Sequence, residues 1–166
     1  MSWAAADIRR VQADSPRDVW DRLLDTLVAY WAESLPDQLN DPEWRAMHEE
    51  RMRRRLAEHP TWLWLYEREA KTHALANFFI TSGRAHIAEF FVVPAYRREG
   101  LGTFLIEEMR RVLRDEGITR VAINLPHGAA AQIDFWRVAG FSEVSVQLEM
   151  STRELAAPPA RAARAD

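Results

Sequence analysis

Residues 92 to 103 decide how this sequence is interpreted; they are Val92-Val93-Pro94-Ala95-Tyr96-Arg97-Arg98-Glu99-Gly100-Leu101-Gly102-Thr103. An apolar strand pattern ends at Pro94, and a helical pattern begins within Gly100-Leu101-Gly102. Glycine lets a ligand come close to the backbone. The first N–H groups of a helix have no partner within the helix and attract negative charge. The stretch therefore predicts an anion-binding turn, with Arg97 and Arg98 adding positive charge at its edge.

This turn matches neither of the two common nucleotide-binding motifs. The third glycine of the dinucleotide-binding fingerprint is absent, and no Gly-Lys-Ser/Thr of a P-loop follows. A helix start that is eased by glycine, with arginines that only face solvent, is the alternative interpretation. The turn alone does not decide between the two.

Hydrophobic periodicity on both sides of the turn predicts the other elements. An apolar helical face runs from the turn to Glu116, and Gly117 suits the position just after a helix. Three short apolar runs before the turn, separated by polar turns, predict an antiparallel meander. The expected strands are residues 7–13, 62–66, 74–80, 85–93, 120–125 and 141–150, and the expected helices are residues 16–33, 42–59, 100–116 and 129–139. This order predicts an α+β fold around a mixed sheet.

Two of these helices begin with a recognisable pattern. Ser15 is expected to cap the first helix, with Pro16 at its first helical position. Asp41-Pro42 starts the second helix, which carries one apolar or aromatic stripe at four-residue spacing. The residues of that stripe are Trp44, His48, Met52 and Leu56.

Length and composition limit the class of protein. The 166 residues suit one domain, expected over residues 1–152, followed by an Ala-, Pro- and Arg-rich tail over 153–166 that has nothing to bury. A net charge of −3 argues against nucleic acid as a partner. The absence of cysteine excludes disulfides, cysteine-bound metals and a cysteine nucleophile. Because no apolar run could span a membrane and no signal-peptide pattern opens the sequence, we expect no membrane partner and a cytoplasmic location.

A second block follows the predicted strand at 120–125 and a short helix, and it reads Phe135-Trp136-Arg137-Val138-Ala139-Gly140-Phe141. With both blocks in this order, the sequence resembles the GNAT superfamily of N-acetyltransferases, whose signature is Arg/Gln-x-x-Gly-x-Gly/Ala at the head of a helix. Arg97, Gly100 and Gly102 fill that signature. The layout is similar over roughly residues 7–150, and the resemblance implies a GNAT-like mixed, mostly antiparallel central sheet flanked by helices.

The resemblance implies acetyl-CoA as cosubstrate and no metal. The backbone amides from Arg98 to Thr103 would hold the pyrophosphate, and the strand around Phe91 to Val93 would bind the pantetheine arm as an added strand would. The thioester would lie where this strand separates from the next one. The cofactor-binding residues expected on this basis are Phe91, Val92, Val93, Arg97, Arg98, Glu99, Gly100, Leu101, Gly102, Thr103 and Trp136. His48 and His86 lack metal-ligand spacing to an acidic partner.

Glu89 is the expected catalytic base. Acetyl transfer to an amine needs a proton to leave, because an amine with a pKa near 10 is mostly protonated at neutral pH. Glu89 is an acid within an apolar strand, between Ala88 and Phe90. Partial burial would raise its pKa toward the working range. The alternative interpretation is a strand glutamate that faces solvent or pairs with an arginine.

Two positions depart from the family pattern. Trp136 stands four residues before Gly140-Phe141, where the family usually has a tyrosine acid, and an indole cannot serve as that acid. Ala129 stands where an asparagine often begins the helix. Either the thiolate leaves without protonation by the enzyme or another group helps, His127 being nearest in sequence. We expect the ring of Trp136 to form a wall of the thioester cleft.

The sequence therefore predicts an acetyl-CoA-dependent N-acetyltransferase that works by direct attack in a ternary complex. The expected acceptor is a small-molecule or peptide amine between the two N-terminal helices and the strand edges, and a homodimer is left open. Trp31, Trp44, Trp62 and Trp64 are candidates for an aromatic acceptor pocket, although the period-two spacing of the last two favours core positions. The alternatives are a noncatalytic acyl-CoA-binding module and a protein N-terminal or lysine acetyltransferase.

Overall fold

The computed structural model describes residues 2–33, 42–125 and 130–144. Two short 3₁₀ turns, Ala5–Asp7 and Pro94–Tyr96, precede β1 and follow β4. The strands are β1 (Ile8–Arg10), β2 (Thr61–Arg68), β3 (Lys71–Thr81), β4 (Arg84–Val92) and β5 (Val121–Ile123). The helices are α1 (Arg17–Ala32), α2 (Pro42–Glu58), α3 (Leu101–Asp115) and α4 (Ala130–Val138).

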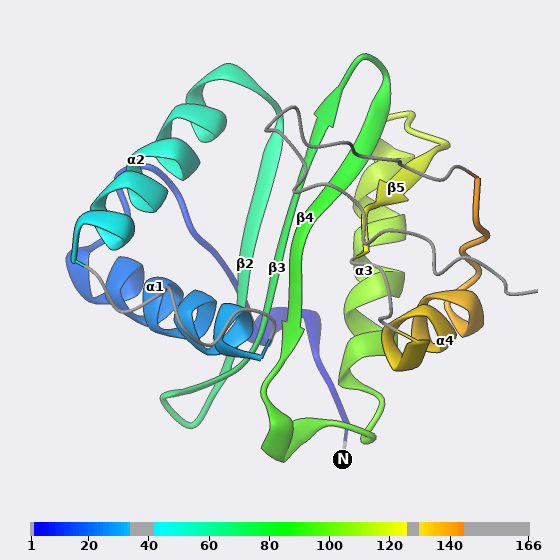
Figure 1. Ribbon diagram of the computed structural model, residues 1–166, viewed down its shortest axis with the longest axis horizontal. Coiled ribbons are helices and arrows are strands. Elements are labelled where there is room, and N and C mark those ends of the chain that lie inside the picture. Colours follow the sequence, from blue (N-terminus) through cyan, green and yellow to red (C-terminus); the bar gives the residue numbers. More distant parts are fainter. Residues whose placement is uncertain (1, 34–41, 126–129, 145–166) are drawn as a thin grey trace, which may run out of the picture.

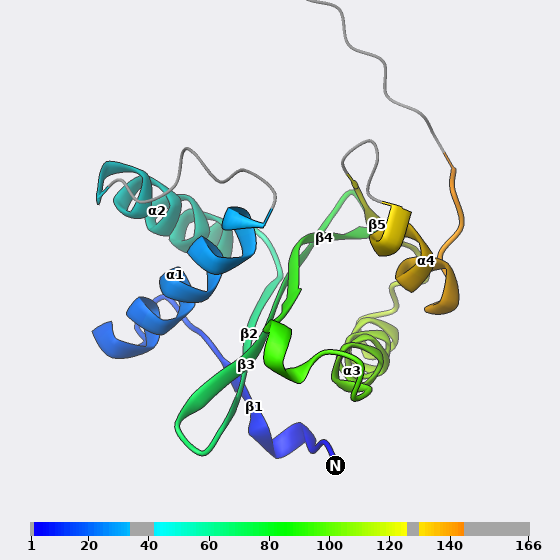
Figure 2. The same ribbon diagram turned by 60° about the horizontal axis from the view of Figure 1, so that its bottom comes forward.

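The five strands form one sheet in the order β1-β2-β3-β4-β5 (Figure 1). The first three pairings are antiparallel and the β4–β5 pairing is parallel. Helices α1 and α2 cover one face of the sheet, and α3 and α4 lie on the other (Figure 2). The prediction of an α+β fold with a mixed, mostly antiparallel sheet flanked by helices is therefore confirmed.

Strand β2 shows how the sheet separates two apolar cores. Its even-numbered residues Trp62, Trp64 and Tyr66 pack with α3, whereas Leu63 and Leu65 pack with α1, as alternation along a strand requires. The core positions predicted for the two tryptophans are confirmed. The idea that they share a pocket with the tryptophans of α1 and α2 is wrong, because these pack on the opposite face of the sheet.

Helix α1 begins differently from the prediction. Its N-cap is Pro16, no side chain caps it, and the first helical residue is Arg17. The hydroxyl of Ser15 accepts a hydrogen bond from the Gln12 amide at 2.8 Å, so it stabilises the preceding turn and not the helix. The helix is held instead by its buried face, which includes Trp20 and Leu23.

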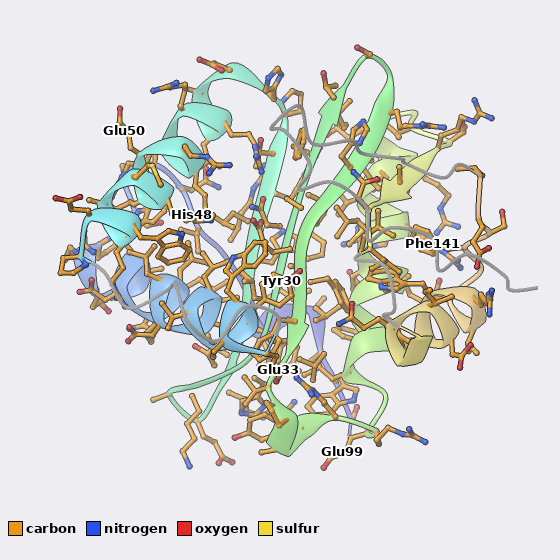
Figure 3. The ribbon with its side chains drawn as sticks, viewed as in Figure 1. Tyr30, Glu33, His48, Glu50, Glu99 and Phe141 are labelled. Atoms are coloured by element: carbon orange, nitrogen blue, oxygen red, sulfur yellow. The ribbon has the colours of Figure 1, made fainter. Side chains whose placement is uncertain are left out.

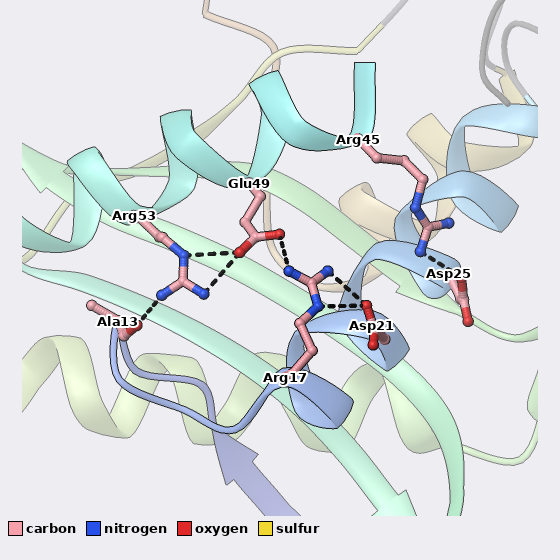
Figure 4. Close-up of polar contacts among 7 residues, drawn as sticks. All are labelled: Ala13, Arg17, Asp21, Asp25, Arg45, Glu49 and Arg53. Atoms are coloured by element: carbon pink, nitrogen blue, oxygen red, sulfur yellow. Dashed lines mark hydrogen bonds and ion pairs between the residues drawn. The ribbon is translucent and has the colours of Figure 1, made fainter. Parts of the chain in front are cut away.

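Ion pairs attach α2 to α1 (Figure 4). The Glu49 carboxylate accepts hydrogen bonds from Arg17 at 2.9 Å and from Arg53 at 2.9 and 2.8 Å. Arg17 also pairs with Asp21 on its own helix at 2.6 Å. Helix α2 fully buries only His48 and Met52, so its fully buried face is small, and the ion pair of Glu49 with Arg17 also joins the helix to α1.

Strand β4 contains a β-bulge that sets the direction of its side chains. Asn77 of β3 pairs with Glu89, but the next pair is Phe78 with Ile87, so Ala88 is an extra residue. Before the bulge Ile87 faces α3, and after it Glu89 lies beside Asn77 on the face covered by α1 and α2.

The C-terminal elements are only partly comparable with the prediction. Strand β5 covers three residues of the expected 120–125. Residues 141–144 are not in a strand, and the remainder of the expected strand at 141–150 lies outside the described residues, as do the tail at 153–166, His127 and Ala129. Across the described ranges, no helix is long and apolar enough to cross a membrane.

Candidate active site

The turn between β4 and α3 has the backbone geometry of an anion site. Gly100 is the N-cap of α3 with φ of 86°, in the left-handed region that favours glycine, and Arg98 has φ of 65°. The first helical hydrogen bond runs from the Phe104 amide to the Gly100 carbonyl at 3.0 Å. No side chain of the described residues caps the amides of the first turn, and the anion site predicted there stays a prediction.

Gly102 has a packing role that the motif did not indicate. A Cβ atom there would lie 3.2 Å from the Phe135 ring and 3.7 Å from Val92 Cγ2, closer to the ring than side chains normally pack. This glycine therefore lets α3 approach α4 and β4, whereas Gly100 supplies the turn.

Arg97 does not add its charge to the edge of the turn. Its Nε donates to the Val92 carbonyl at 2.8 Å, and its Nη2 contacts both carboxylate oxygens of Glu33 at 2.7 and 2.9 Å. Arg97 thus joins the end of α1 to the end of β4. Arg98, which is exposed and has no ion pair within the described part of the chain, is the arginine with free charge.

The N-terminal segment also contacts this turn, which no pattern in the sequence indicated. The indole Nε1 of Trp3 donates to the Glu99 carbonyl at 2.9 Å. The ring packs edge-on against Tyr66, with 5.6 Å between centroids. His73, the extra residue of a second bulge, stacks on Tyr96 in the turn at 3.6 Å.

Strand β4 leaves part of its edge free of β5. The parallel pairing covers only residues 85–87, so residues 88–92 have no β5 partner in the described chain. At the end of this edge, the Val93 amide donates to the His73 carbonyl at 2.9 Å, and the Val92 carbonyl accepts from Arg97. The Val93 amide and the Val92 carbonyl are therefore not free to bind a pantetheine arm. Backbone contacts with the arm are expected only from the residues of β4 before Val92.

Glu89 lies under α1 and α2 and is only 6% exposed. Asn77 Nδ2 donates to Glu89 Oε2 at 2.5 Å. His48 Nε2 lies 3.8 Å from Glu89 Oε1. Figure 3 shows His48 on α2 and Tyr30 on α1, on the side where these helices cover the sheet. The alternative of a solvent-facing or arginine-paired strand glutamate does not describe this side chain.

The electrostatics of this group suit acid–base chemistry. Burial raises the pKa of Glu89 above its ordinary value, opposed by the Asn77 hydrogen bond and the charges of Arg55 and Arg51. Burial, with the same two arginines, lowers the pKa of His48 to about 4, so its imidazole is neutral at neutral pH. Burial and the field of Glu89 raise the pKa of Tyr30.

Trp136 is a packing residue in this structure. It is 5% exposed, and its ring meets those of Phe90, Phe135 and Phe141 edge-on at 5.0 to 5.1 Å. This aromatic cluster lies on the α3 face of the sheet, opposite Glu89. Its contact with Phe90 places the indole behind the free edge of β4.

Other parts of the described chain offer no competing centre. No group of three His, Asp or Glu side chains could hold a metal within the described ranges. A shallow surface hollow between β1, β2 and α3 is lined partly by Arg10, Trp64 and Glu108, remote from Glu89 on the other face. The arrangement thus combines an uncapped helix start with a buried carboxyl on opposite sides of one strand.

Comparison with known proteins identifies the family of this chain. The acetyltransferase (GNAT) family model matches residues 20–141. The chain therefore belongs to the acetyltransferase (GNAT) family, and its class is that of an N-acetyltransferase. No curated protein sequence matches it significantly.

Solved structures share the fold at low sequence identity. The apo aminoglycoside 6'-N-acetyltransferase AAC(6')-IG from Acinetobacter haemolyticus is 18% identical with a TM-score of 0.68, covering 89% of this chain and 98% of that one. PaiA N-acetyltransferase from Thermoplasma acidophilum, in complex with coenzyme A, is 13% identical with a TM-score of 0.69, covering 89% and 94%. AAC(6')-Iy, in complex with a bisubstrate analogue of CoA and acetylneamine, is 14% identical with a TM-score of 0.64, covering 88% and 97%.

Proposed function

We propose that this protein transfers the acetyl group of acetyl-CoA to a primary amine by direct attack in a ternary complex. The observation that carries the proposal is Glu89, a buried carboxyl with a raised pKa, set by a bulge next to the free edge of β4. The donor site begins at the end of the same strand, at the first turn of α3. One strand thus separates the group that receives a proton from the site that holds the thioester.

The residues of the turn fit an acetyl-CoA pyrophosphate. The uncapped amides of Leu101, Gly102 and Thr103 point out of the helix start, Gly100 provides the left-handed turn, and Arg98 supplies a free positive charge. Glu99 would contribute its backbone only. Along β4, the backbone up to Phe91 would hold the pantetheine arm, with Trp136 packed behind it, while the Val92 carbonyl stays bonded to Arg97. Arg97 and Val93 would support the site through the contacts they already make.

On becoming an amide, a neutral primary amine loses one proton from nitrogen, and its ammonium form loses two, while one bond is exchanged at carbon. The amine enters the reaction neutral, after any ammonium proton has been lost to solvent, and the ionised Glu89 carboxylate takes the proton of the attacking nitrogen, directly or through water. The nitrogen forms a bond to the thioester carbon, and the carbon–sulfur bond breaks to release CoA. Trp136 cannot protonate the leaving sulfur, so the thiolate leaves without help from that side chain.

The acceptor side favours an amine that carries few positive charges. The charges that act on Glu89 come from Arg51 and Arg55, both on α2. Tyr30, Trp31 and Trp44 supply aromatic surface on the same side. A small-molecule or peptide monoamine suits this field better than a polycation does, although two structural neighbours are aminoglycoside acetyltransferases.

Calorimetry with acetyl-CoA, followed by a thiol-release assay against a panel of amines, tests the proposal. We expect one acetyl-CoA bound per chain and CoA release that depends on the amine. Binding without release for any small amine or peptide would contradict the proposal and favour the noncatalytic acyl-CoA-binding module. Release only with peptides or lysine side chains would identify a protein acetyltransferase.

A further inference from the structure

Two buried polar atoms beside Glu89 have no hydrogen-bond partner in the described chain. They are His48 Nε2 and Asn77 Oδ1. Their residues are 7% and 1% exposed. A buried polar atom without a partner is costly and uncommon, so two of them around one carboxyl indicate a place for polar groups of a ligand.

Packing holds the imidazole of His48 in place, and its Nε2 has no hydrogen-bond partner among the described residues. Its ring stacks on Trp44, one helical turn earlier, with 4.9 Å between centroids and 20° between planes. Met52, one turn later, is also buried against the sheet. Helix and stack together fix Nε2 at 3.8 Å from Glu89 Oε1. This is longer than a hydrogen bond, but such contacts in a ligand-free site often shorten when the substrate is bound.

The groups that face this pair come from four elements. Arg51 and Arg55 act from α2, the Tyr30 phenol from α1, the Asn77 amide from β3, and Glu89 itself lies on β4. Both arginines oppose protonation of His48, which stays neutral at neutral pH. A neutral imidazole with its hydrogen on Nε2 is a donor to an ionised carboxylate.

We propose that His48 is a positioning residue that, with Asn77, holds Glu89 ionised and oriented for the incoming amine. His48 Nε2–H would donate to Oε1 while Asn77 Nδ2 donates to Oε2. The free Asn77 Oδ1 would then accept an N–H of the amine and direct its lone pair away from Glu89. The inference rests on the proposed function, since it assigns a role relative to Glu89 as the base.

Substitution of His48 tests this role through the pH dependence of kcat, which reports the protonation states of the enzyme–substrate complex, where the contact would shorten. In His48→Leu one donor to the ionised carboxylate is lost, so the acidic limb should move up by about one pH unit, with about tenfold lower activity just below it. His48→Gln places an amide N–H near the same point and should restore both values. His48→Phe retains the stack on Trp44 without a donor, and it replaces the leucine variant if that one does not fold.

Stability and a double substitution separate the outcomes. Replacing an unpartnered buried polar group by an apolar one should leave the free energy of unfolding unchanged or higher. A leucine variant that is less stable, with the wild-type acidic limb, would show a packing role and overturn the inference. In a Glu89→Gln background, His48→Leu should cause no further loss of activity. If Glu89→Gln alone retained wild-type kcat/KM, the proposed function itself would fail. If Glu89→Gln lost activity but the His48 variants had the wild-type rate and pH profile, the proposed function would stand and this inference would be overturned.

Discussion

The two sides of β4 are built in different ways. On the side of α3, the proposed donor site consists of backbone amides, two glycines and an exposed arginine within one continuous stretch of chain. On the side of α1 and α2, Glu89 lies close to two residues from other elements. His48 is on α2, 41 positions earlier in the sequence, and Asn77 is on the neighbouring strand β3. The donor side is local and exposed, whereas the acceptor side is assembled by tertiary packing and buried.

This difference explains what substitutions on each side should do. On the donor side, a change should weaken the binding of acetyl-CoA with little effect on the chemical step. On the acceptor side, a change should alter the protonation of Glu89 and with it the pH dependence of the reaction. The two sides can therefore be tested separately, by affinity on one and by rate against pH on the other.

The largest effect is expected for Glu89→Gln. Removal of a general base typically lowers the rate by 10²- to 10⁴-fold, and we expect kcat/KM to fall within that range with acetyl-CoA affinity unchanged. Glu67→Gln, in a strand carboxylate that is paired with Arg9 and Arg22, is the matched control and should leave kcat/KM nearly unchanged.

Glu89→Gln should also raise the free energy of unfolding at neutral pH. Because burial raises the folded-state pKa of Glu89 above its ordinary value of 4.5, the ionised side chain destabilises the fold once the pH exceeds that value. Chemical denaturation at pH 5 and pH 8 should show a gain for Glu89→Gln over wild type that grows with pH. A loss at pH 8 would indicate that the carboxylate is stabilised in the fold.

Asn77→Asp should have the next largest effect. It replaces the 2.5 Å hydrogen bond to Glu89 by a second carboxyl, and two such groups at this distance share one proton. The acidic limb of kcat/KM should move up by about one to two pH units, and activity at a pH below the wild-type limb should fall by roughly tenfold to 100-fold. An unmoved limb would mean that Glu89 does not control the reaction.

On the donor side, Thr103→Glu should separate affinity from stability. Thr103 is the third residue of α3 and is exposed, and a carboxylate there can cap the free amides itself. The charge should stabilise the helix by about 0.3–1 kcal/mol while it competes with the pyrophosphate. Calorimetry should show at least about tenfold weaker acetyl-CoA binding in Thr103→Glu, since one such charge is worth about 1.4 kcal/mol or more in a shielded site, and little change in Thr103→Gln.

Trp3→Phe should have the smallest effect on the donor side. It removes the indole N–H that donates to the Glu99 carbonyl but keeps an aromatic ring against Tyr66. Loss of one hydrogen bond that orders the turn should weaken acetyl-CoA binding about threefold to fivefold, in line with about 1 kcal/mol. Equal affinity for both proteins would show that the N-terminal segment does not support the turn.

Most of the donor side could be predicted from the sequence, because a left-handed Gly100 and an uncapped helix start depend on neighbouring residues only. The exceptions are Arg97 and Gly102, whose actual partners, Glu33 and Phe135, are distant in sequence. A motif gives the position of a residue along the chain, but it does not show which side chains from distant parts of the sequence contact that residue.

The acceptor side could be predicted only in part. Glu89 stood out as an acid in an apolar strand, but nothing in the sequence indicated that Ala88 forms a bulge. Without that extra residue, alternation would place Glu89 on the same face as Ile87, toward α3. His48 was visible only as a member of a helical stripe, since its approach to Glu89 depends on how α2 lies across the sheet. The four-tryptophan pocket failed because two of its members face the other core.

A direct titration of the Glu89 carboxyl tests the central claim. With ¹³C-labelled glutamate, the resonance that disappears in Glu89→Gln identifies the side chain. We predict that its pKa in the free protein lies above 4.5 and equals the acidic limb of the wild-type kcat/KM profile, which reports the essential groups of the free enzyme. A carboxyl that titrates at or below 4.5, with an acidic limb elsewhere, would contradict the assignment of Glu89 as the base.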